Sequence, residues 1–455
     1  MQVARAQRET APFVSDLRRA PCASFCFCVS YHRTVYPLTS STPHSLNSFK
    51  EVLEYLDSLI NYEVDFPLGG SRDMPKLAPV YDAARELKLP LELPKCIHIA
   101  GTVGKGSIAA MCQAMLSVRS RVLTFTSPHL VTPKERVQLD GHDLPDEIWC
   151  EGIEFIRQRL NQSAIKLTYF ETVFVFYLWC ARRLCTDAHV VETGLGGSFD
   201  ATNVLQKTTA VLTKIDFDHT AILGKTLREI ARDKSGIVKD GATCYTVAQE
   251  SDALAQIENA CQRTKSLLSI EGRDFETDRS FVLPLSGEFQ RSNLSVALAV
   301  VKSLDTALSD DDIKAALRKM TLRGRQQKLA TRPNILIDVC HNPASFAELA
   351  KYLRDDSGFE KRIVLVAMMK DKDARESLRH LIGVTDELWL TEAPTPRTLA
   401  AAALKSIADD LGLNAKCVER EAAYRELLSL PDSVQGVVCG SFYLVGDFLK
   451  SNPDA

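Results

Sequence analysis

The stretch that most constrains this sequence is residues 97–111, where an apolar run leads through a glycine-rich turn into a second apolar run. Cys96–Ala100 predicts a buried strand, and the Ala-, Met- and Leu-rich run after Ser107 predicts a helix. Glycines in such a turn bring backbone N–H groups close to a ligand, at the positive end of the following helix. A lysine there supplies a mobile charge for a β- or γ-phosphate. The turn contains Gly101, Gly104, Lys105 and Gly106.

The stretch therefore predicts a nucleotide-phosphate loop, altered in that Gly106 separates the lysine from the hydroxyl residue Ser107. The alternative is an ordinary glycine-rich turn between a strand and a helix. The combination of strand, glycine spacing, lysine and helix favours the phosphate loop.

The bulk composition is that of a globular protein with two domains. The chain has 455 residues, of which 45% are hydrophobic and 25% charged. A net charge of −3 provides no overall field to recruit nucleic acid or an anionic membrane. No apolar run approaches the length needed to span a bilayer. The 13 cysteines are scattered, which is typical of reduced core residues. Cys22, Cys26 and Cys28 lie close together but lack the partners of a zinc site.

Residues 1–47 differ from the rest of the chain. They hold five arginines, no lysine, two acidic residues and many Ser, Thr and Pro residues. This composition allows an organellar transit peptide. A disordered or mis-assigned leader without function is the alternative.

The remaining pattern alternates strands with helices, which predicts an α/β fold with a mostly parallel sheet. Residue patterns indicate helices within residues 53–62, 80–87, 146–160, 168–184, 227–234 and 305–322, the last of them polar and with three aspartates at its start. Short apolar runs indicate strands at residues 121–125, 189–191, 210–213, 335–339, 363–366, 388–390 and 437–438. We expect a leader at 1–47, a phosphate-loop domain at 48–321 and a smaller Rossmann-like α/β domain at 322–455.

Three polar residues follow strands of the first domain: Ser127, Glu192 and His219. In open α/β sheets, ligands bind at the carboxyl edge of the strands. A hydroxyl, a carboxylate and an imidazole at that edge are suited to share a divalent ion with ATP phosphates. Each residue taken singly has an ordinary role as a helix cap as its alternative.

Lys234 lies on the apolar stripe of its predicted helix together with Leu227, Ile230 and Ala231. A lysine on that stripe is desolvated, which lowers its pKa and makes it nucleophilic or open to modification. The alternative is a dipole partner at the helix end, where Gly236 supplies a stop.

In the second domain, Asp338 and His341 follow a strand at a spacing that lets both face one ligand. Arg325 lies near the domain junction, from which it can reach phosphates across a cleft. Local capping and a surface ion pair are the alternatives for these three residues.

Taken together, the ordered motifs resemble the folylpolyglutamate synthase and dihydrofolate synthase family, relatives of the Mur peptide ligases. The matching segments extend over residues 50–448. Lys105-Gly106-Ser107 favours the folate branch, because a Mur ligase proper usually carries Lys-Thr-Thr in its phosphate loop. The segments are GTVGKGS (101–107), TSPHL (126–130), TYFE (168–171), ETGLGGSFDATN (192–203), DFDHTAILGKTLREIARDKSGIVK (216–239), GEFQRSN (287–293), GRQQ (324–327), DVCHNP (338–343) and GSFYLVG (440–446).

The resemblance implies a role for each matching residue. ATP would be held by Gly104, Lys105, Gly106, Ser107, Asn293, Arg325 and Asp338. Magnesium would be ligated by Ser127, Glu192 and His219, with a second magnesium held through a carbamylated Lys234. Catalytic roles would fall to Lys105, Lys234 and His341. The pterin-side pocket would include Thr168, Tyr169, Phe170, Glu171 and Asp200.

Two residues depart from the family pattern. Val103 stands where the family usually has Asn, which removes a side-chain amide but is expected to leave the backbone donors of the loop intact. Ser198 stands where the family usually has Arg, which removes a cation near the expected acyl-phosphate site.

The implied activity is ATP-dependent ligation of L-glutamate to a folate-type carboxylate through an acyl phosphate, with cleft closure as a gate and no redox cofactor. Alternatives are a monofunctional dihydrofolate synthase, a phosphate-loop kinase or NTPase, and a binding-only homologue weakened at Val103 and Ser198. Expected partners are small molecules, with no nucleic acid and no membrane, and the expected state is a monomer. The expected location is cytoplasmic, or organellar if residues 1–47 are a transit peptide.

Overall fold

The computed structural model describes residues 45–62, 77–276, 280, 281, 283, 288–320 and 322–452. The predicted leader lies outside these ranges except for its last three residues, and so do Cys22, Cys26 and Cys28. Residues from Leu46 onward form one compact unit. This unit contains two sheets, and we call the part before residue 321 the N-terminal lobe and the part after it the C-terminal lobe.

An eight-stranded sheet organises the N-terminal lobe, with the strand order β4-β3-β2-β5-β1-β6-β7-β8. Strands β2, β5, β1, β6, β7 and β8 are parallel, whereas β3 and β4 are antiparallel additions at one edge. The bounds are β1 (Cys96–Ala100), β2 (Val122–Phe125), β3 (Val137–Leu139), β4 (His142–Asp143), β5 (Ala188–Glu192), β6 (Thr209–Leu212), β7 (Thr243–Thr246) and β8 (Leu267–Ile270). The predicted α/β class with a mostly parallel sheet is confirmed.

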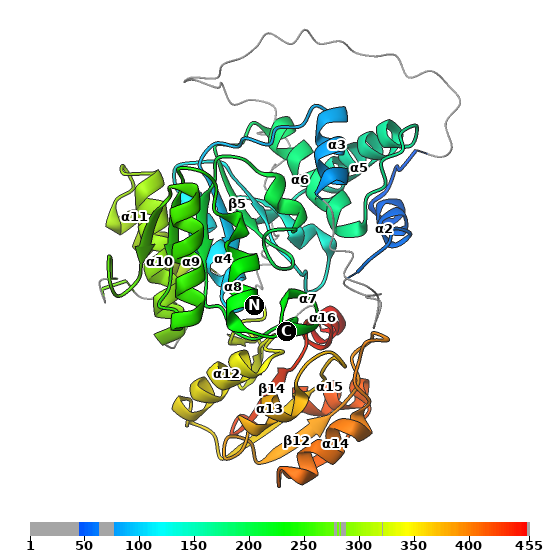
Figure 1. Ribbon diagram of the computed structural model, residues 1–455. Helices are drawn as coiled ribbons and strands as arrows, with labels where there is room; N and C mark the ends of the chain where they lie inside the picture. Colours follow the sequence, from blue (N-terminus) through cyan, green and yellow to red (C-terminus); the bar gives the residue numbers. More distant parts are fainter. Residues whose placement is uncertain are drawn as a thin grey trace, which may run out of the picture. The chain divides into compact units, whose positions relative to one another are not determined.

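Helices cover both faces of this sheet (Figure 1). On one face, strand residues such as Phe125 pack with α2, α3, α5 and α6, and Leu212 packs with α8 and α9. On the other face, alternate residues such as Val211 pack with α4, α10 and α11. The helices are α2 (Phe49–Asp57), α3 (Ala78–Glu86), α4 (Lys105–Leu116), α5 (Asp146–Leu160), α6 (Tyr169–Leu184), α7 (Thr220–Leu223), α8 (Leu227–Lys234), α9 (Ser251–Thr264), α10 (Glu288–Leu304) and α11 (Asp310–Lys319), with 3₁₀ turns η1 (Pro133–Arg136), η2 (Ala201–Val204) and η3 (Ser235–Ile237).

A six-stranded sheet organises the C-terminal lobe, with the order β13-β12-β11-β14-β10-β9. All its strands are parallel except β9 at the edge. Apolar clusters fill both faces beneath the helices coloured yellow to red in Figure 1. The elements are β9 (Gln327–Lys328), β10 (Ile335–Ile337), α12 (Pro343–Asp355), β11 (Lys361–Val366), α13 (Ala374–Arg379), β12 (Glu387–Leu390), α14 (Ala401–Asp410), β13 (Ala415–Cys417), α15 (Arg420–Leu428), β14 (Val434–Cys439) and α16 (Phe442–Ser451). The boundary predicted between residues 321 and 322 falls between α11 and β9.

Two helix predictions had wrong bounds because capping outweighs apolar spacing. The helix expected within 53–62 begins at Phe49, since Ser48 and Glu51 form a capping box, and it ends at Asp57. The helix expected over 305–322 begins only at Asp310, where the Ser309 side chain caps it.

The described cysteines are free thiols, most of them buried. Among the helices of the described ranges, none combines the length and apolar character required to cross a membrane.

Candidate active site

The glycine-rich turn closes β1 and starts α4 with a left-handed residue. Gly104 has φ +97° and is the N-cap of α4, so the helix begins at Lys105. A side chain at Gly104 would be strained, because an added Cβ would lie 2.7 Å from Asn293 Oδ1. Gly104 therefore allows α4 to begin directly after the turn, and a helix N-terminus is a favourable place for an anion.

Two lysines converge on one carbonyl of this loop. Lys234 Nζ donates to the Gly101 carbonyl at 2.8 Å, and Lys105 Nζ donates to the same oxygen at 3.4 Å. Lys234 is the last residue of α8 and is buried, as its place on the apolar stripe predicts. Burial lowers the pKa of Lys234 to about 7, and the neighbouring charge of Lys105 adds to the effect.

Glu192 ends β5 beside this pair. It is only 5% exposed, its Oε1 lies 3.8 Å from Lys105 Nζ, and its Oε2 accepts from the Ser127 backbone N–H at 3.4 Å. Burial raises the pKa of the Glu192 carboxyl, and the charges of Lys105 and Arg325 oppose that rise. The Glu192 carboxylate is buried and its contacts with Lys105 and Ser127 are long. It therefore fits a divalent cation, which would complete the neutralisation of its charge.

The third predicted metal ligand, His219, makes no hydrogen bond or ion pair with Glu192 or Lys105. It is close enough to Lys234 for the charge of that lysine to affect its pKa. His219 has φ +49° and begins α7, with Nε2 3.9 Å from Asp218 Oδ2. Burial lowers the pKa of its imidazole, and Lys372 and Lys234 act in the same direction. The described residues contain no group of three or more His, Cys, Asp or Glu side chains able to hold a metal. An ion here would depend on few protein ligands, which is usual for magnesium.

Two amide side chains of α10, those of Gln290 and Asn293, lie beside the phosphate loop. Asn293 is fully buried and donates to Gln290 Oε1 at 3.1 Å, while its own Oδ1 has no hydrogen-bond partner and faces Gly104. Gln290 Nε2 in turn lies 3.4 Å from the Ser107 hydroxyl. Asn293 was predicted here, whereas Gln290 was missed, although it lies one helical turn before Asn293.

The C-terminal lobe contributes Arg325, Asp338 and His341. Asp338 accepts backbone N–H groups of Gln326 at 2.9 Å and Cys340 at 2.8 Å, so its hydrogen bonds are local. Arg325 has no ion-pair partner among the described residues, and its guanidinium lies 5.5 Å from the ring centre of Phe442. Its charge nevertheless acts on Glu192 of the other lobe. The Arg325 charge therefore acts both on Asp338 of its own lobe and on Glu192 beside the phosphate loop.

Asp218 is a second residue that sequence reasoning missed. Its carboxylate accepts from Lys372 Nζ at 2.6 Å and from Asn342 Nδ2 at 3.3 Å, and His341 Nε2 lies 3.8 Å away. Burial raises the pKa of Asp218, but His219, Lys372 and His341 together hold it well below its usual range. A usable signal was present, because a second acidic residue precedes His219 directly after the strand.

The predicted pterin-side residues divide into two groups. Thr168 and Glu171 form a capping box, with each side chain bonded to the other's backbone N–H at 3.3 and 2.8 Å. Asp200 accepts the backbone N–H groups of Gly194 and Leu195 at 2.8 and 2.9 Å.

Phe170 is half-buried and covers the same turn, since a Cβ on Gly194 would lie 2.6 Å from its ring. Tyr169 is buried, with the Arg136 guanidinium 5.2 Å from its ring centre. Of the five predicted residues, Phe170 alone combines partial exposure with a place over the glycine turn.

The two departures from the family pattern have structural roles. Val103 N–H donates to the Lys214 carbonyl at 3.2 Å, so this backbone donor ties the loop to the segment after β6. Ser198 Oγ donates to the Asp233 carbonyl at 2.9 Å, and a Cβ on Gly236 would lie 2.1 Å from it. Ser198 thus fastens the glycine turn after β5 to the end of α8.

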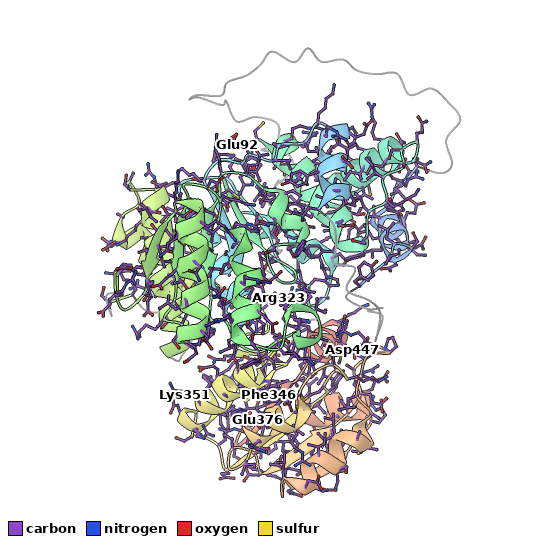
Figure 2. The ribbon with its side chains drawn as sticks, viewed as in Figure 1. Glu92, Arg323, Phe346, Lys351, Glu376 and Asp447 are labelled. Carbon is purple, nitrogen blue, oxygen red and sulfur yellow. The ribbon has the colours of Figure 1, made fainter. Side chains whose placement is uncertain are left out.

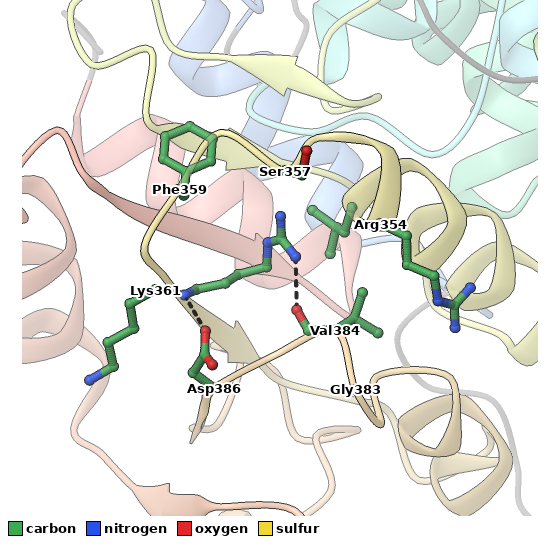
Figure 3. Close-up of a pocket in the computed structure, with 9 residues that line it drawn as sticks. Arg354, Ser357, Phe359, Lys361, Gly383, Val384 and Asp386 are labelled. Carbon is green, nitrogen blue, oxygen red and sulfur yellow. Dashed lines mark hydrogen bonds between the residues drawn. The ribbon is translucent and has the colours of Figure 1, made fainter.

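A hollow of about 290 Å³ in the C-terminal lobe is separate from this site (Figure 3). Arg362 lines it and donates to the Val384 carbonyl at 2.9 Å, and Lys361 pairs with Glu387 at 2.9 Å. Both of these cations are therefore already bonded within the protein.

Comparison with known proteins was decisive. Residues 324–442 match the family model "Mur ligase, glutamate ligase domain". The dihydrofolate synthase/folylpolyglutamate synthase of Haemophilus influenzae is 32% identical over 344 residues, covering 68% of this chain and 76% of the relative. The chain belongs to the dihydrofolate synthase/folylpolyglutamate synthase family. The family member of Mycobacterium tuberculosis is 30% identical over 352 residues, covering 68% of this chain and 72% of that protein.

Solved structures of family members share the whole fold. Escherichia coli FolC, in complex with DHPP and ADP, superposes with a TM-score of 0.79 at 26% identity over 90% of this chain and 99% of that one. The bifunctional folylpolyglutamate synthase/dihydrofolate synthase of Yersinia pestis, complexed with AMPPNP and Mn ion, superposes with a TM-score of 0.78 at 27% identity over 90% of this chain and 99% of that one. The predicted pair of Mur-ligase-type α/β domains is therefore confirmed.

Proposed function

We propose that this protein is an ATP-dependent ligase that joins L-glutamate to a folate-type carboxylate, dihydropteroate or a tetrahydrofolate polyglutamate. The observation that carries the proposal is the convergence of Lys105, Lys234 and Glu192 on the open end of α4, with Arg325 facing them from the other lobe. The bound ligands of the E. coli and Y. pestis relatives support the same assignment.

The chemistry requires ATP because a carboxylate is too poor an electrophile to react with an amine in water. Transfer of the γ-phosphoryl group to the carboxylate gives an acyl phosphate, and the amine of glutamate then displaces phosphate. This transfer needs charge neutralisation and positioning more than covalent chemistry from the protein. Lys105 at the phosphate loop and Arg325 from the C-terminal lobe supply positive charge on opposite sides of the phosphates.

In this proposal the nucleotide is held by Gly104, Lys105, Gly106, Ser107, Asn293, Arg325 and Asp338. The loop supplies N–H donors at the start of α4, and the unpartnered Asn293 Oδ1 behind Gly104 is an acceptor available to the site. Ser127, Glu192 and His219 would hold a magnesium ion, which when bound would neutralise phosphate charge.

We further propose that Lys234 is carbamylated and so contributes to a second magnesium site. Carbamylation requires a neutral amine, and burial favours that form of Lys234. The product is an anion, which would relieve the like-charge contact between Lys234 and Lys105 at the Gly101 carbonyl.

Substrate positions follow from the remaining groups. Phe170 over the glycine turn after β5 offers an aromatic face to a pterin ring, with Thr168, Tyr169, Glu171 and Asp200 holding that wall in shape. His341, which is bonded through Nδ1 to the Val339 carbonyl at 3.0 Å, would in this proposal orient the incoming amine.

One assay tests the proposal: ADP release with L-glutamate and, in parallel, dihydropteroate, tetrahydrofolate or no pterin, with product mass measured in each case. Pterin-dependent ADP release with a gain of one glutamyl unit supports it, and the preferred pterin separates a monofunctional dihydrofolate synthase from a chain extender. ADP release without pterin and glutamate would indicate an NTPase. Nucleotide binding without turnover would indicate a binding-only homologue.

The proposal assigns small molecules as the only partners, with no nucleic acid, no membrane and a monomeric state. A cytoplasmic location is proposed, or an organellar one if residues 1–47 act as a transit peptide. Size-exclusion chromatography with light scattering tests the monomer, and imaging of the full chain with and without residues 1–47 tests the location.

A further inference from the structure

The loop that carries Ser127 is anchored in the opposite lobe. Leu130 and Val131 pack against the apolar cluster of the C-terminal lobe that includes Val339, Leu444 and Val445. The loop follows β2 of the N-terminal sheet, so these two side chains cross the lobe boundary.

Two glycines of the C-terminal lobe make room for Leu130. A Cβ on Gly446 of α16 would lie 1.9 Å from the Leu130 carbonyl oxygen, and a Cβ on Gly324 would lie 3.0 Å from Leu130 Cδ1. The first distance involves the backbone of Leu130, which has no rotamer to change. Leu130 can therefore lie this close to α16 only because residue 446 has no side chain.

The segment that follows Ser127 is bonded to its own next turn. The Glu135 carboxylate accepts the N–H groups of Leu130 at 2.7 Å, Val131 at 3.1 Å and Thr132 at 3.3 Å. Arg136 Nε, from the same turn, lies 2.8 Å from His129 Nδ1. These hydrogen bonds restrain the backbone of residues 130–132 next to Ser127.

The same loop meets the C-terminal lobe at a polar contact and the phosphate site at its other end. Arg323, labelled in Figure 2, donates to Glu135 Oε1 at 3.3 Å. Ser127 N–H donates to Glu192 Oε2, and Glu192 lies beside Lys105. An unbroken series of contacts thus runs from α16 through Leu130 to the carboxylate at the phosphate loop.

We infer that Leu130 is a positioning residue. Its packing against the C-terminal lobe holds Ser127 and Glu192 in place, so that the metal–nucleotide site is fully formed only when the two lobes are docked. Leu130 itself touches no substrate in this scheme. The inference rests on the proposed function only in taking Ser127 and Glu192 as part of a metal–nucleotide site.

The test compares Leu130→Ala with Leu427→Ala, a leucine of the same apolar cluster that lies in α15 and contacts β14 near Gly436. Both changes remove the same atoms from one core. Gly446→Ala provides a second variant that displaces Leu130 without altering it. The readouts are thermal unfolding, ADP binding without metal, binding of Mn²⁺ in the presence of ADP by electron paramagnetic resonance, and amide hydrogen exchange at residues 127–132.

We expect Leu130→Ala and Gly446→Ala to weaken Mn²⁺ binding at least fivefold and to speed exchange at residues 127–132, with metal-free ADP affinity within twofold of the parent. Leu427→Ala should lower the melting temperature without either change. Equal Mn²⁺ affinities in folded Leu130→Ala and Leu427→Ala proteins would overturn the inference. Because these readouts need no turnover, they remain decisive if the proposed ligase reaction fails, and a wild-type protein that binds no Mn²⁺ with ADP would refute the site itself.

Discussion

Replacing Gly104 by alanine should damage the phosphate loop through two separable effects. The residue has φ +97°, which for an alanine costs about 1–2 kcal/mol. The new Cβ would also lie 2.7 Å from Asn293 Oδ1 and 3.1 Å from Phe289 Cζ, an overpacking that typically costs about 1–3 kcal/mol. The sum is roughly 2–5 kcal/mol. Because Asn293 is fully buried, the strain has little room to relax.

This energy must appear in one of two measurements. If the loop keeps its geometry, the free energy of unfolding in urea falls by roughly 2–5 kcal/mol. If the loop gives way, the donors at the start of α4 leave their positions and calorimetry should show ADP binding weakened by about 30-fold or more. Gly241→Ala is the matched control, since Gly241 has φ +66° and nothing within 4 Å of an added Cβ.

The control should lose only the backbone contribution, about 1 kcal/mol, and should bind ADP normally. The double variant Gly104→Ala, Asn293→Ala should recover part of the stability, because the collision is removed. Unfolding energies and ADP affinities of Gly104→Ala that equal those of Gly241→Ala would refute this account of the loop.

Three further predictions concern the site and the core. Arg325→Ala should lower kcat about 100-fold or more, with a smaller effect on ADP binding. Arg325→Lys should restore part of the rate. Full activity of the alanine variant in the ADP-release assay would contradict the role assigned to this cation. Lys234→Met and Lys234→Arg should both lack ligase activity, and ¹³C NMR with labelled bicarbonate should show a carbamate signal in the parent alone; an active Lys234→Arg protein would rule carbamylation out. Burial lowers the pKa values of His98 and His189 to about 3, so the unfolded chain binds more protons below its own pKa of about 6.5. The free energy of unfolding should therefore fall by roughly 2 kcal/mol per histidine between pH 6.5 and 5. His98→Gln should remove the contribution of one histidine to this fall. If the free energy of unfolding in urea changed with pH as in the parent, His98 would have an ordinary pKa.

Local pattern was sufficient for the parts of the site that lie close together in sequence. The strand, glycine turn and helix around Lys105 follow from residues 96–111 alone, and helical spacing alone placed Lys234 on a buried stripe. Strand ends placed Ser127 and Glu192 at one sheet edge because parallel strands share a direction. These features depend on backbone geometry that neighbouring residues determine.

Contacts between distant elements were beyond such reasoning. The pairing of Asp218 with Lys372 joins residues 154 positions apart, across two lobes whose docking leaves no periodic signal in either segment. The buried Asn293 carbonyl behind Gly104 likewise depends on how α10 packs on α4. The start of α2 was missed for a different reason. Its capping box is present in the sequence, but the prediction relied on the spacing of apolar residues instead.

The meeting of Lys105 and Lys234 at one carbonyl has a practical consequence for anyone handling this protein. Below the lowered pKa of Lys234, about 7, both amines carry a proton and repel each other, so a small oxyanion that neutralises them should bind and stabilise the fold. Sulfate or phosphate in a storage buffer would then raise the melting temperature while competing with nucleotide. Affinities are therefore best measured in chloride or acetate buffers, and a melting-temperature screen of simple salts offers a first sign of whether the site is intact.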